Sequence, residues 1–198
     1  MRIGARSGLA HFCNRRAALL PIDDAEIRER VNQPTRYDSP MHPRAETLIR
    51  QLALEPHVEG GRYRRIYEST MQTPFGEEAR PRAVATSIYY LLLAGETSRW
   101  HRVDADELWH WYEGDALELL RFDPRDNTLV RHRLGPVASD AAPVFVVPAG
   151  CWQSARPLGA YTLAGCTVAP GYEWRGFRTL ESESEVAAQL RAIDPRLP

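Results

Sequence analysis

The fold is decided by residues 95–114, which read GETSRWHRVDADELWHWYEG. Five residues separate Gly95 from His101, and five more separate His101 from Glu107. Six further residues then lead to Gly114. Glycine at each end favours a turn, and the aromatic-rich run between the two glycines favours a β-strand. The stretch therefore predicts β-structure that carries a histidine and a carboxylate at fixed positions.

The strand at the end of this stretch carries a candidate binding surface. Side-chain alternation over residues 107–112 places Trp109 and Trp111 on the face of Glu107, and His110 on the opposite face. Aromatic walls beside a few polar groups are typical of a small-molecule pocket. The alternative is that both tryptophans only fill a hydrophobic core.

Short β-rich runs continue on both sides of this stretch and are separated by Gly, Pro, Asp or Asn. They cover residues 62–67, 83–93, 107–112, 116–122, 129–134, 144–147, 161–168 and 177–180. Many short strands at regular spacing predict a sandwich, barrel or jelly roll. One amphipathic helix is predicted before them, from Pro43 to Leu54, and another after them, from Ser182 to Ile193.

Residues 1–43 are predicted to be a flexible N-terminal tail with a short helix at 23–31, followed by one domain at 44–198. The tail mixes Arg, Gly, Asp and Pro without sustained periodicity. Met41 stands directly before the first well-patterned segment. Translation from Met1 and translation from Met41 are therefore both open.

Composition argues against several classes of function. The 198-residue chain has 25 basic and 26 acidic side chains and a net charge of −1, so nothing favours nucleic acid or an anionic membrane as a partner. Its three cysteines have no CxxC spacing, which argues against a zinc knuckle or a redox motif. No run reaches the roughly 18 apolar residues that a membrane helix needs. We therefore expect a cytoplasmic protein.

A second short stretch, VPAGCWQ at residues 147–153, carries another polar candidate. Pro148 and Gly150 predict a turn that would return the chain to the rim carrying His101 and Glu107. We therefore expect Gln153 to converge with His101 and Glu107 in one cavity.

Together the two stretches resemble the two sequence motifs of the cupin superfamily. EGG at 59–61, IYYLL at 88–92 and CTVAPG at 166–171 narrow the resemblance to the small single-domain cupins of unknown function. The resemblance extends over residues 45–180. It implies an all-β fold, the cupin double-stranded β-helix or jelly-roll barrel, with a short N-terminal helix and a C-terminal helix.

The chain departs from the cupin motifs at the positions that usually ligate a divalent metal. Val103 stands in place of the second histidine of the first motif, and Gln153 in place of the histidine of the second. The resemblance therefore implies His101, Glu107 and Gln153 as the metal-binding positions. One imidazole, one carboxylate and one amide make a weak site. We predict that no cofactor is required and keep a divalent metal as the alternative.

Further ligand-binding candidates lie on other segments. Tyr89 and Tyr90 alternate, so one of them faces the pocket; Tyr89 is the candidate, although the sequence does not decide between them. Glu59 either closes the pocket mouth or only precedes a glycine turn. The candidate partners for the buried carboxylate of Glu107 are Arg64, Arg99 and the ligand itself, because such a group needs a compensating charge, a metal or a proton.

The leading functional hypothesis is binding of an unidentified small polar or sugar-like molecule inside the barrel. His101 would act as an acid/base or orienting group and Glu107 as its partner carboxylate, in metal-independent chemistry like that of the sugar-nucleotide epimerases with a similar shape. One alternative is a metal-dependent oxygenase or isomerase with a reduced ligand set. Another is a non-catalytic ligand-binding or structural dimer. Whether the protein is an enzyme stays open, and the resemblance implies a homodimer.

Overall fold

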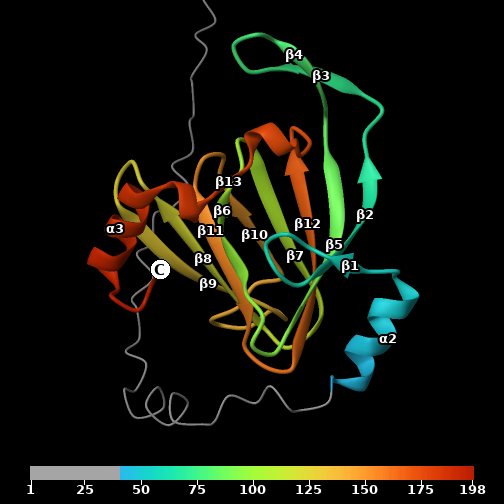
Figure 1. Cartoon of the computed structure of the whole chain (residues 1–198). Coiled ribbons are helices and arrows are strands. Elements are labelled where there is room, and N and C mark those ends of the chain that lie inside the picture. The colour runs from blue at the N-terminus through green and yellow to red at the C-terminus, as the bar shows by residue number, and fades with distance from the viewer. Residues whose placement is uncertain (1–40) are drawn as a thin grey trace, which may run out of the picture. The chain divides into compact units, whose positions relative to one another are not determined.

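The computed structural model describes residues 41–198, which form a β-barrel domain with two flanking helices (Figure 1). The tail predicted at 1–43 therefore lies outside the described residues except for its last three, as does the helix predicted at 23–31. Those last three residues lead into helix α2, Pro43–Gln51, and the Nδ1 atom of His42 accepts a hydrogen bond from the N–H of Arg44 at 3.2 Å. Pro43 suits the first helical turn because its missing N–H would have no partner there.

Two antiparallel sheets make up the barrel (Figure 1). The six-stranded sheet has the order β1, Glu55–Pro56; β2, Arg62–Glu68; β5, Thr86–Leu93; β12, Tyr161–Ala169; β7, Asp106–Gly114; and β10, Val144–Val147. The five-stranded sheet has the order β13, Arg178–Thr179; β6, Ser98–Arg102; β11, Trp152–Pro157; β8, Leu117–Asp123; and β9, Thr128–Leu134. A separate hairpin pairs β3, Gln72–Phe75, with β4, Arg80–Ala83.

The main hydrophobic core lies between the two sheets. Leu92 and Ala164 reach it from the six-stranded sheet, and Leu117, Leu119 and Leu134 reach it from the five-stranded sheet. Their neighbours along β5 and β12, Leu91 and Leu163, are also buried and point to the opposite face, so these strands are covered on both sides.

Each helix covers part of the outer face of one sheet. Ala45 and Leu48 of α2 pack in a cluster with Leu91 and Leu163 of the six-stranded sheet. On the five-stranded sheet, the C-terminal helix α3, Ser184–Ile193, packs Leu190 in a cluster with Phe122 and Trp152. Within residues 41–198, neither helix has the length and hydropathy needed to cross a membrane.

The predicted strands agree with the structure in most places. Strands β1, β6 and β11 and the β3–β4 hairpin were not predicted. Half of the strand predicted at 177–180 is present, because Arg178–Thr179 pairs and a 3-10 helix covers Leu180–Ser182. A second 3-10 helix, Trp174–Gly176, precedes it.

Candidate functional site

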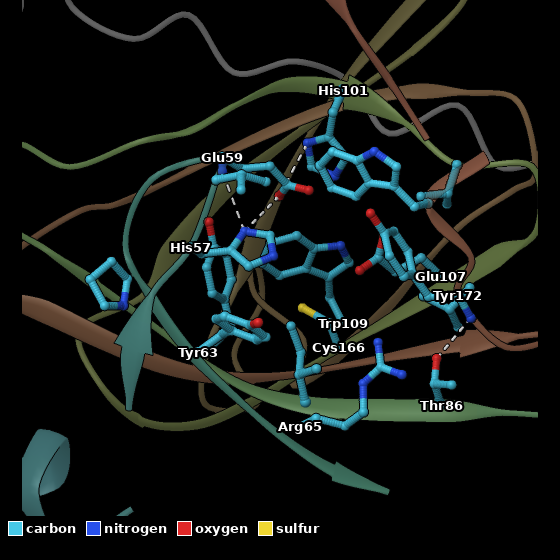
Figure 2. A pocket seen from close by; sticks show the side chains of 17 residues that line it. His57, Glu59, Tyr63, Arg65, Thr86, His101, Glu107, Trp109, Cys166 and Tyr172 are labelled. Atoms are coloured by element: carbon cyan, nitrogen blue, oxygen red, sulfur yellow. Dashed lines mark hydrogen bonds and ion pairs between the residues drawn. The ribbon is translucent and has the colours of Figure 1, made fainter. Parts of the chain in front are cut away.

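A cavity of about 180 Å³ opens against the inner face of the six-stranded sheet (Figure 2). Strands β2, β5, β7 and β12 supply most of its wall, β6 supplies one histidine, and the segments at 56–59 and 172–174 form its rim. The polar lining residues are His57, Glu59, Tyr63, Arg65, Thr86, Tyr90, His101, Glu107, Cys166 and Tyr172. A site of this kind pairs hydrophobic walls with a few convergent polar groups.

Gln153 lies behind the cavity wall and joins three of the predicted site residues. Its Nε2 atom donates to Glu107 Oε2 at 2.5 Å and lies 3.1 Å from His101 Nε2. Its Oε1 atom accepts from the indole N–H of Trp109 at 2.9 Å. The structure therefore brings His101, Glu107 and Gln153 together, with Trp109 as their fourth member.

The hydrogen-bond partners fix the orientation of the Gln153 amide and the tautomer of His101. An indole N–H only donates, so the amide atom facing Trp109 is the oxygen and the NH₂ group faces His101 and Glu107. The second ring nitrogen of His101, Nδ1, lies 2.7 Å from the carbonyl oxygen of Arg99 and must donate to it. His101 therefore carries its proton on Nδ1 and accepts the Gln153 proton on Nε2, so both ring nitrogens are engaged.

Glu59 is held at the rim by a rigid turn. Gly60 and Gly61 have φ angles of 110° and 67°, and a Cβ atom on Gly60 would lie 2.4 Å from the carbonyl oxygen of Thr97. The turn that the sequence predicts here is therefore present and admits only glycine. The N–H of Arg99 donates to the carbonyl oxygen of Glu59 at 2.8 Å, which ties the turn to β6.

The carboxyl group of Glu59 points into the cavity between two histidines (Figure 2). Its Oε2 atom accepts from Ser98 Oγ at 3.2 Å. The same oxygen lies 3.7 Å from His57 Nδ1 and 3.5 Å from His101 Nδ1. Glu59 is 8% exposed, so this carboxyl group has little water around it.

Burial shifts the pKa values of the two carboxyl groups and the two imidazoles in the direction that favours the uncharged form of each. It raises the pKa of Glu59 to about 8, against the opposing effects of the Ser98 hydrogen bond and the Arg99 charge. It also raises the pKa of Glu107, with opposition from His101 and from hydrogen bonds of Gln153 and Cys166. Burial lowers the pKa of His57 to about 4 and lowers that of His101. The Glu59–histidine contacts at neutral pH therefore join uncharged groups and are not ion pairs.

The rim opposite Glu59 carries the only arginine among the described residues that line the cavity. Arg65 lies on β2 with its guanidinium turned toward the cavity (Figure 2). Its Nη1 atom donates to Glu68 Oε2 at 2.8 Å, and both side chains of that pair are largely exposed. Tyr172 also lines the cavity and is held through its backbone N–H, which donates to Thr86 Oγ1 at 2.8 Å.

Comparison with known proteins identifies the family. Residues 46–180 match the family described as "Cupin superfamily (DUF985)". The chain belongs to this cupin family. A search of functionally curated proteins gives no match.

Two solved structures resemble this cupin over most of both chains. A protein from Shewanella oneidensis is 35% identical, with a TM-score of 0.66, and the match covers 77% of this chain and 96% of that one. A hypothetical protein from Leishmania major is 30% identical, with a TM-score of 0.65, and the match covers 77% and 93% of the two chains. The predicted family and the predicted jelly-roll fold are both confirmed.

Four residues predicted to bind the ligand do not line the cavity of this cupin: Gln153 lies behind its wall, and the other three lie elsewhere. Tyr89 faces outward, and Tyr90 takes the inner position, with its hydroxyl donating to the Gly60 carbonyl at 2.8 Å. Arg64 is half-exposed on the outer face of β2, 3.8 Å from Glu55. These positions were wrong because the phase of strand alternation is set by pairing with the neighbouring strand, which the sequence does not show.

Trp111 is the third residue that was misplaced. It follows Trp109 on β7 but lies beyond the cavity, where its indole N–H donates to the Asp115 carbonyl at 3.3 Å. It packs, half-buried, against the core cluster. The alternative reading of Trp111 as a core residue is therefore the one that agrees with the structure.

Several cavity residues were missed by sequence reasoning. Alternation from Tyr63 would have placed Arg65 on the inner face of β2, because the two are separated by one residue. His57 lies two residues before Glu59, and its inclusion required only that the turn at 59–61 fold over the cavity. For Tyr172, which follows the last strand of the six-stranded sheet, no sequence signal indicated that it returns to the rim.

The donor set does not fit a tight divalent metal site of the cupin kind. His101 Nε2 accepts from Gln153, and Gln153 Oε1 accepts from Trp109, so the atoms that would ligate a metal already have partners. Val103, in place of the second histidine, lines the cavity with an aliphatic side chain. Within residues 41–198, no group of three or more His, Cys, Asp or Glu side chains is arranged to hold a metal ion.

Proposed function

We propose that this cupin binds a small polar molecule in the cavity and acts on it by metal-independent proton transfer. The observation that carries the proposal is the Gln153 bridge. One amide holds an imidazole and a carboxylate together and uses the ring nitrogen that a metal would need. The site is preorganised in this way by hydrogen bonds alone.

Glu107 and Glu59 are the acid/base pair that this arrangement supports. They approach the cavity from different walls, Glu107 from β7 and Glu59 from the rim (Figure 2). Burial raises the pKa of both carboxyl groups. The short hydrogen bond from Gln153 opposes the rise for Glu107, so the proposal assigns the carboxylate form to Glu107, whereas Glu59 accepts only a longer hydrogen bond from Ser98 and is assigned the protonated form. Two carboxyl groups in environments that separate their proton affinities are typical of base and acid roles.

The reaction class that fits such a pair is isomerisation or epimerisation next to a carbonyl group. The Glu107 carboxylate would remove a proton from carbon, and the electron pair would move onto the carbonyl oxygen as an enolate forms. Glu59 would then deliver its own proton to the substrate, so that the product has the composition of the substrate and nothing is oxidised or reduced. In this scheme His101 is an orienting group, because both its ring nitrogens are engaged.

Ligand binding by matched variants tests the proposal. Native mass spectrometry of the untagged protein would first reveal a retained metabolite, which then serves as the probe. We expect Glu107→Gln to weaken its binding at least tenfold and to change the pH dependence. His110→Ala is the control, because His110 stacks on Tyr112 outside the cavity. Equal binding by the wild type and a His101→Ala, Glu107→Gln double variant would overturn the proposal.

Elemental analysis of the same untagged sample distinguishes the metal-dependent alternative from the metal-independent proposal. Near-stoichiometric Fe, Mn, Ni or Zn would favour an oxygenase or isomerase with a reduced ligand set. Substoichiometric metal together with a bound metabolite supports the metal-independent proposal. A bound metabolite that is never turned over would instead indicate a non-catalytic ligand-binding protein.

Homodimer formation and a cytoplasmic location stay predictions. The dimer is supported by the edge strand β10, where Val144 and Val146 are 43% and 48% exposed. They pair with His110 and Leu108 of β7, so the four side chains share the outer face of the sheet. An apolar edge of this kind is commonly covered in a folded protein. A monomer in light scattering at micromolar concentration would contradict the dimer.

A further inference from the structure

The polar groups of the cavity differ in burial. The carboxyl groups of Glu59, from the rim turn, and of Glu107, from β7, are enclosed, since the two residues are only 8% and 7% exposed. The part of the rim opposite Glu59 carries Arg65, which is more exposed and is the only permanently cationic side chain among the described lining residues. Ile88 and Val168 add apolar wall. We call the enclosed side with the two carboxyl groups the buried end. A ligand that fits this cavity therefore meets chemically different groups at its two ends.

Arg65 is available to a ligand. Its partner Glu68 lies outside the cavity lining, and the two side chains are 41% and 58% exposed. An exposed ion pair of this kind contributes little and is readily exchanged. A guanidinium group binds a carboxylate with two parallel hydrogen bonds, which is stronger and more directional than the single bond to Glu68.

Tyr172 supplies a further polar group to the cavity lining. Burial raises the pKa of Tyr172, the two cavity carboxyl groups add to the rise, and the charge of Arg65 opposes it less strongly. The phenol is therefore a neutral hydrogen-bond donor in a cavity that also holds a guanidinium group. The guanidinium group suits an anion, whereas a carboxylate at Glu107 repels one.

The volume limits the size of the ligand. An engineered cavity of about 150 Å³ binds benzene, so a cavity of about 180 Å³ holds a molecule only slightly larger. At the buried end, the two carboxyl groups accept hydrogen bonds from a hydroxyl group, and the protonated Glu59 donates one to a carbonyl oxygen.

We infer that the ligand is a small hydroxy or keto acid whose carboxylate binds Arg65 at the rim while its hydroxyl or carbonyl group reaches Glu59 and Glu107. This inference rests on the proposed use of the cavity as the binding site. It adds the substrate class, a carboxylic acid, to that proposal.

Paired acids and amides provide the test. The probes are lactate with lactamide, benzoate with benzamide, inorganic phosphate and xylose, and the readout is the indole N–H signal of Trp109 in a ¹H–¹⁵N spectrum. We expect the two carboxylates to bind at least tenfold more tightly than their amides. Arg65→Gln should remove this preference, and Arg64→Gln, its outward-facing neighbour, should leave it within twofold of the wild type.

The outcomes separate the inference from the proposed function. Amides or xylose that bind as tightly as the carboxylates would overturn the carboxylate inference and leave the cavity as the binding site. Phosphate that binds more tightly than both carboxylates would also overturn it, in favour of a phosphorylated ligand. If no probe shifts the Trp109 signal at concentrations up to its solubility limit, both the inference and the proposed site fail.

Discussion

The space between the two sheets is filled in opposite ways along its length. At one end Leu92, Leu117, Leu119 and Leu134 are at most 1% exposed and fill the interior with aliphatic side chains. At the other end the side chains of His101, Glu107 and Gln153 are enclosed nearly as completely and surround a cavity. Strand β5 passes from one to the other, because Ile88 and Tyr90 face the cavity and Leu92 faces the core.

The contrast indicates which end serves stability and which serves function. Burial of aliphatic side chains is the main favourable term in folding. Burial of polar groups is unfavourable unless each group finds a partner, and a carboxyl group is the most costly of them. A chain that encloses two glutamates beside an open space gives up stability there. Such sacrifices are typical of functional sites.

The largest expected effect is at the aliphatic end. Leu119→Ala should lower the free energy of unfolding by about 3 kcal/mol, because it leaves a void in a closed core. Ile88→Ala removes a side chain of similar size from the cavity wall and should cost about half as much, roughly 1.5 kcal/mol, because it only enlarges an existing space. Urea denaturation measures both. Equal losses would show that the cavity end is packed as tightly as the core.

The polar end should make stability depend on pH above neutrality. Unfolded Glu59 ionises near its ordinary pKa of 4.5, whereas the folded side chain keeps its proton up to a pKa of about 8. In this range the unfolded state binds fewer protons, so stability falls as the pH rises. Between pH 6.5 and 8.5 the loss from Glu59 alone is on the order of 2 kcal/mol.

Glu59→Gln isolates this contribution. The pKa values of His57 and His101 are lowered, so their effect lies mostly below pH 6.5. At the lower edge of the window an unfolded histidine is still half protonated, which makes stability rise slightly with pH in the wild type and the variant alike. The pKa of Glu107 is also raised, and the part of this rise that comes from Glu59 is lost in the variant. We expect the pH slope to become markedly smaller in Glu59→Gln and to stay unchanged in Glu55→Gln, which removes an exposed carboxylate nearby. A slope unaffected by Glu59→Gln would contradict the buried, protonated state of this residue.

The sequence predicted the aliphatic end better than the polar end. The alternating runs at 116–122 and 129–134 correspond closely to β8 and β9. A strand with one face in the core and one face toward solvent alternates apolar and polar residues, and this alternation is visible in the sequence. Strands β6 and β11 carry no such signal. Ser98, Gln153 and Ser154 are buried polar residues there, so the pattern that marks a strand is absent where the site is built.

Some positions of individual site residues were predicted correctly and others were not. Motif spacing brought His101, Glu107 and Gln153 together correctly, because it reports a geometry shared by a whole family. Tyr89 and Arg64 were each wrong by one residue, since a shift of one position reverses the face of a strand. On β2 the pairing with β5 changes register between Arg65 and Tyr67. No pattern in the sequence of β2 predicts this bulge.

The smallest expected effect is a difference in the free energy of unfolding between two tryptophan variants. It tests whether the hydrogen bond from Trp109 fixes the Gln153 amide. Trp109→Phe and Trp111→Phe remove the same indole from the same strand, one at the cavity and one beyond it. Only Trp109→Phe leaves the buried Gln153 oxygen without the donor that it has in the structure, whereas Trp111 bonds the Asp115 carbonyl at a more exposed position. We expect Trp109→Phe to cost about 1 kcal/mol more in the free energy of unfolding, the typical cost of an unsatisfied buried acceptor. Equal losses would mean that the amide turns freely, and the bridge between His101 and Glu107 would then not be fixed by Trp109.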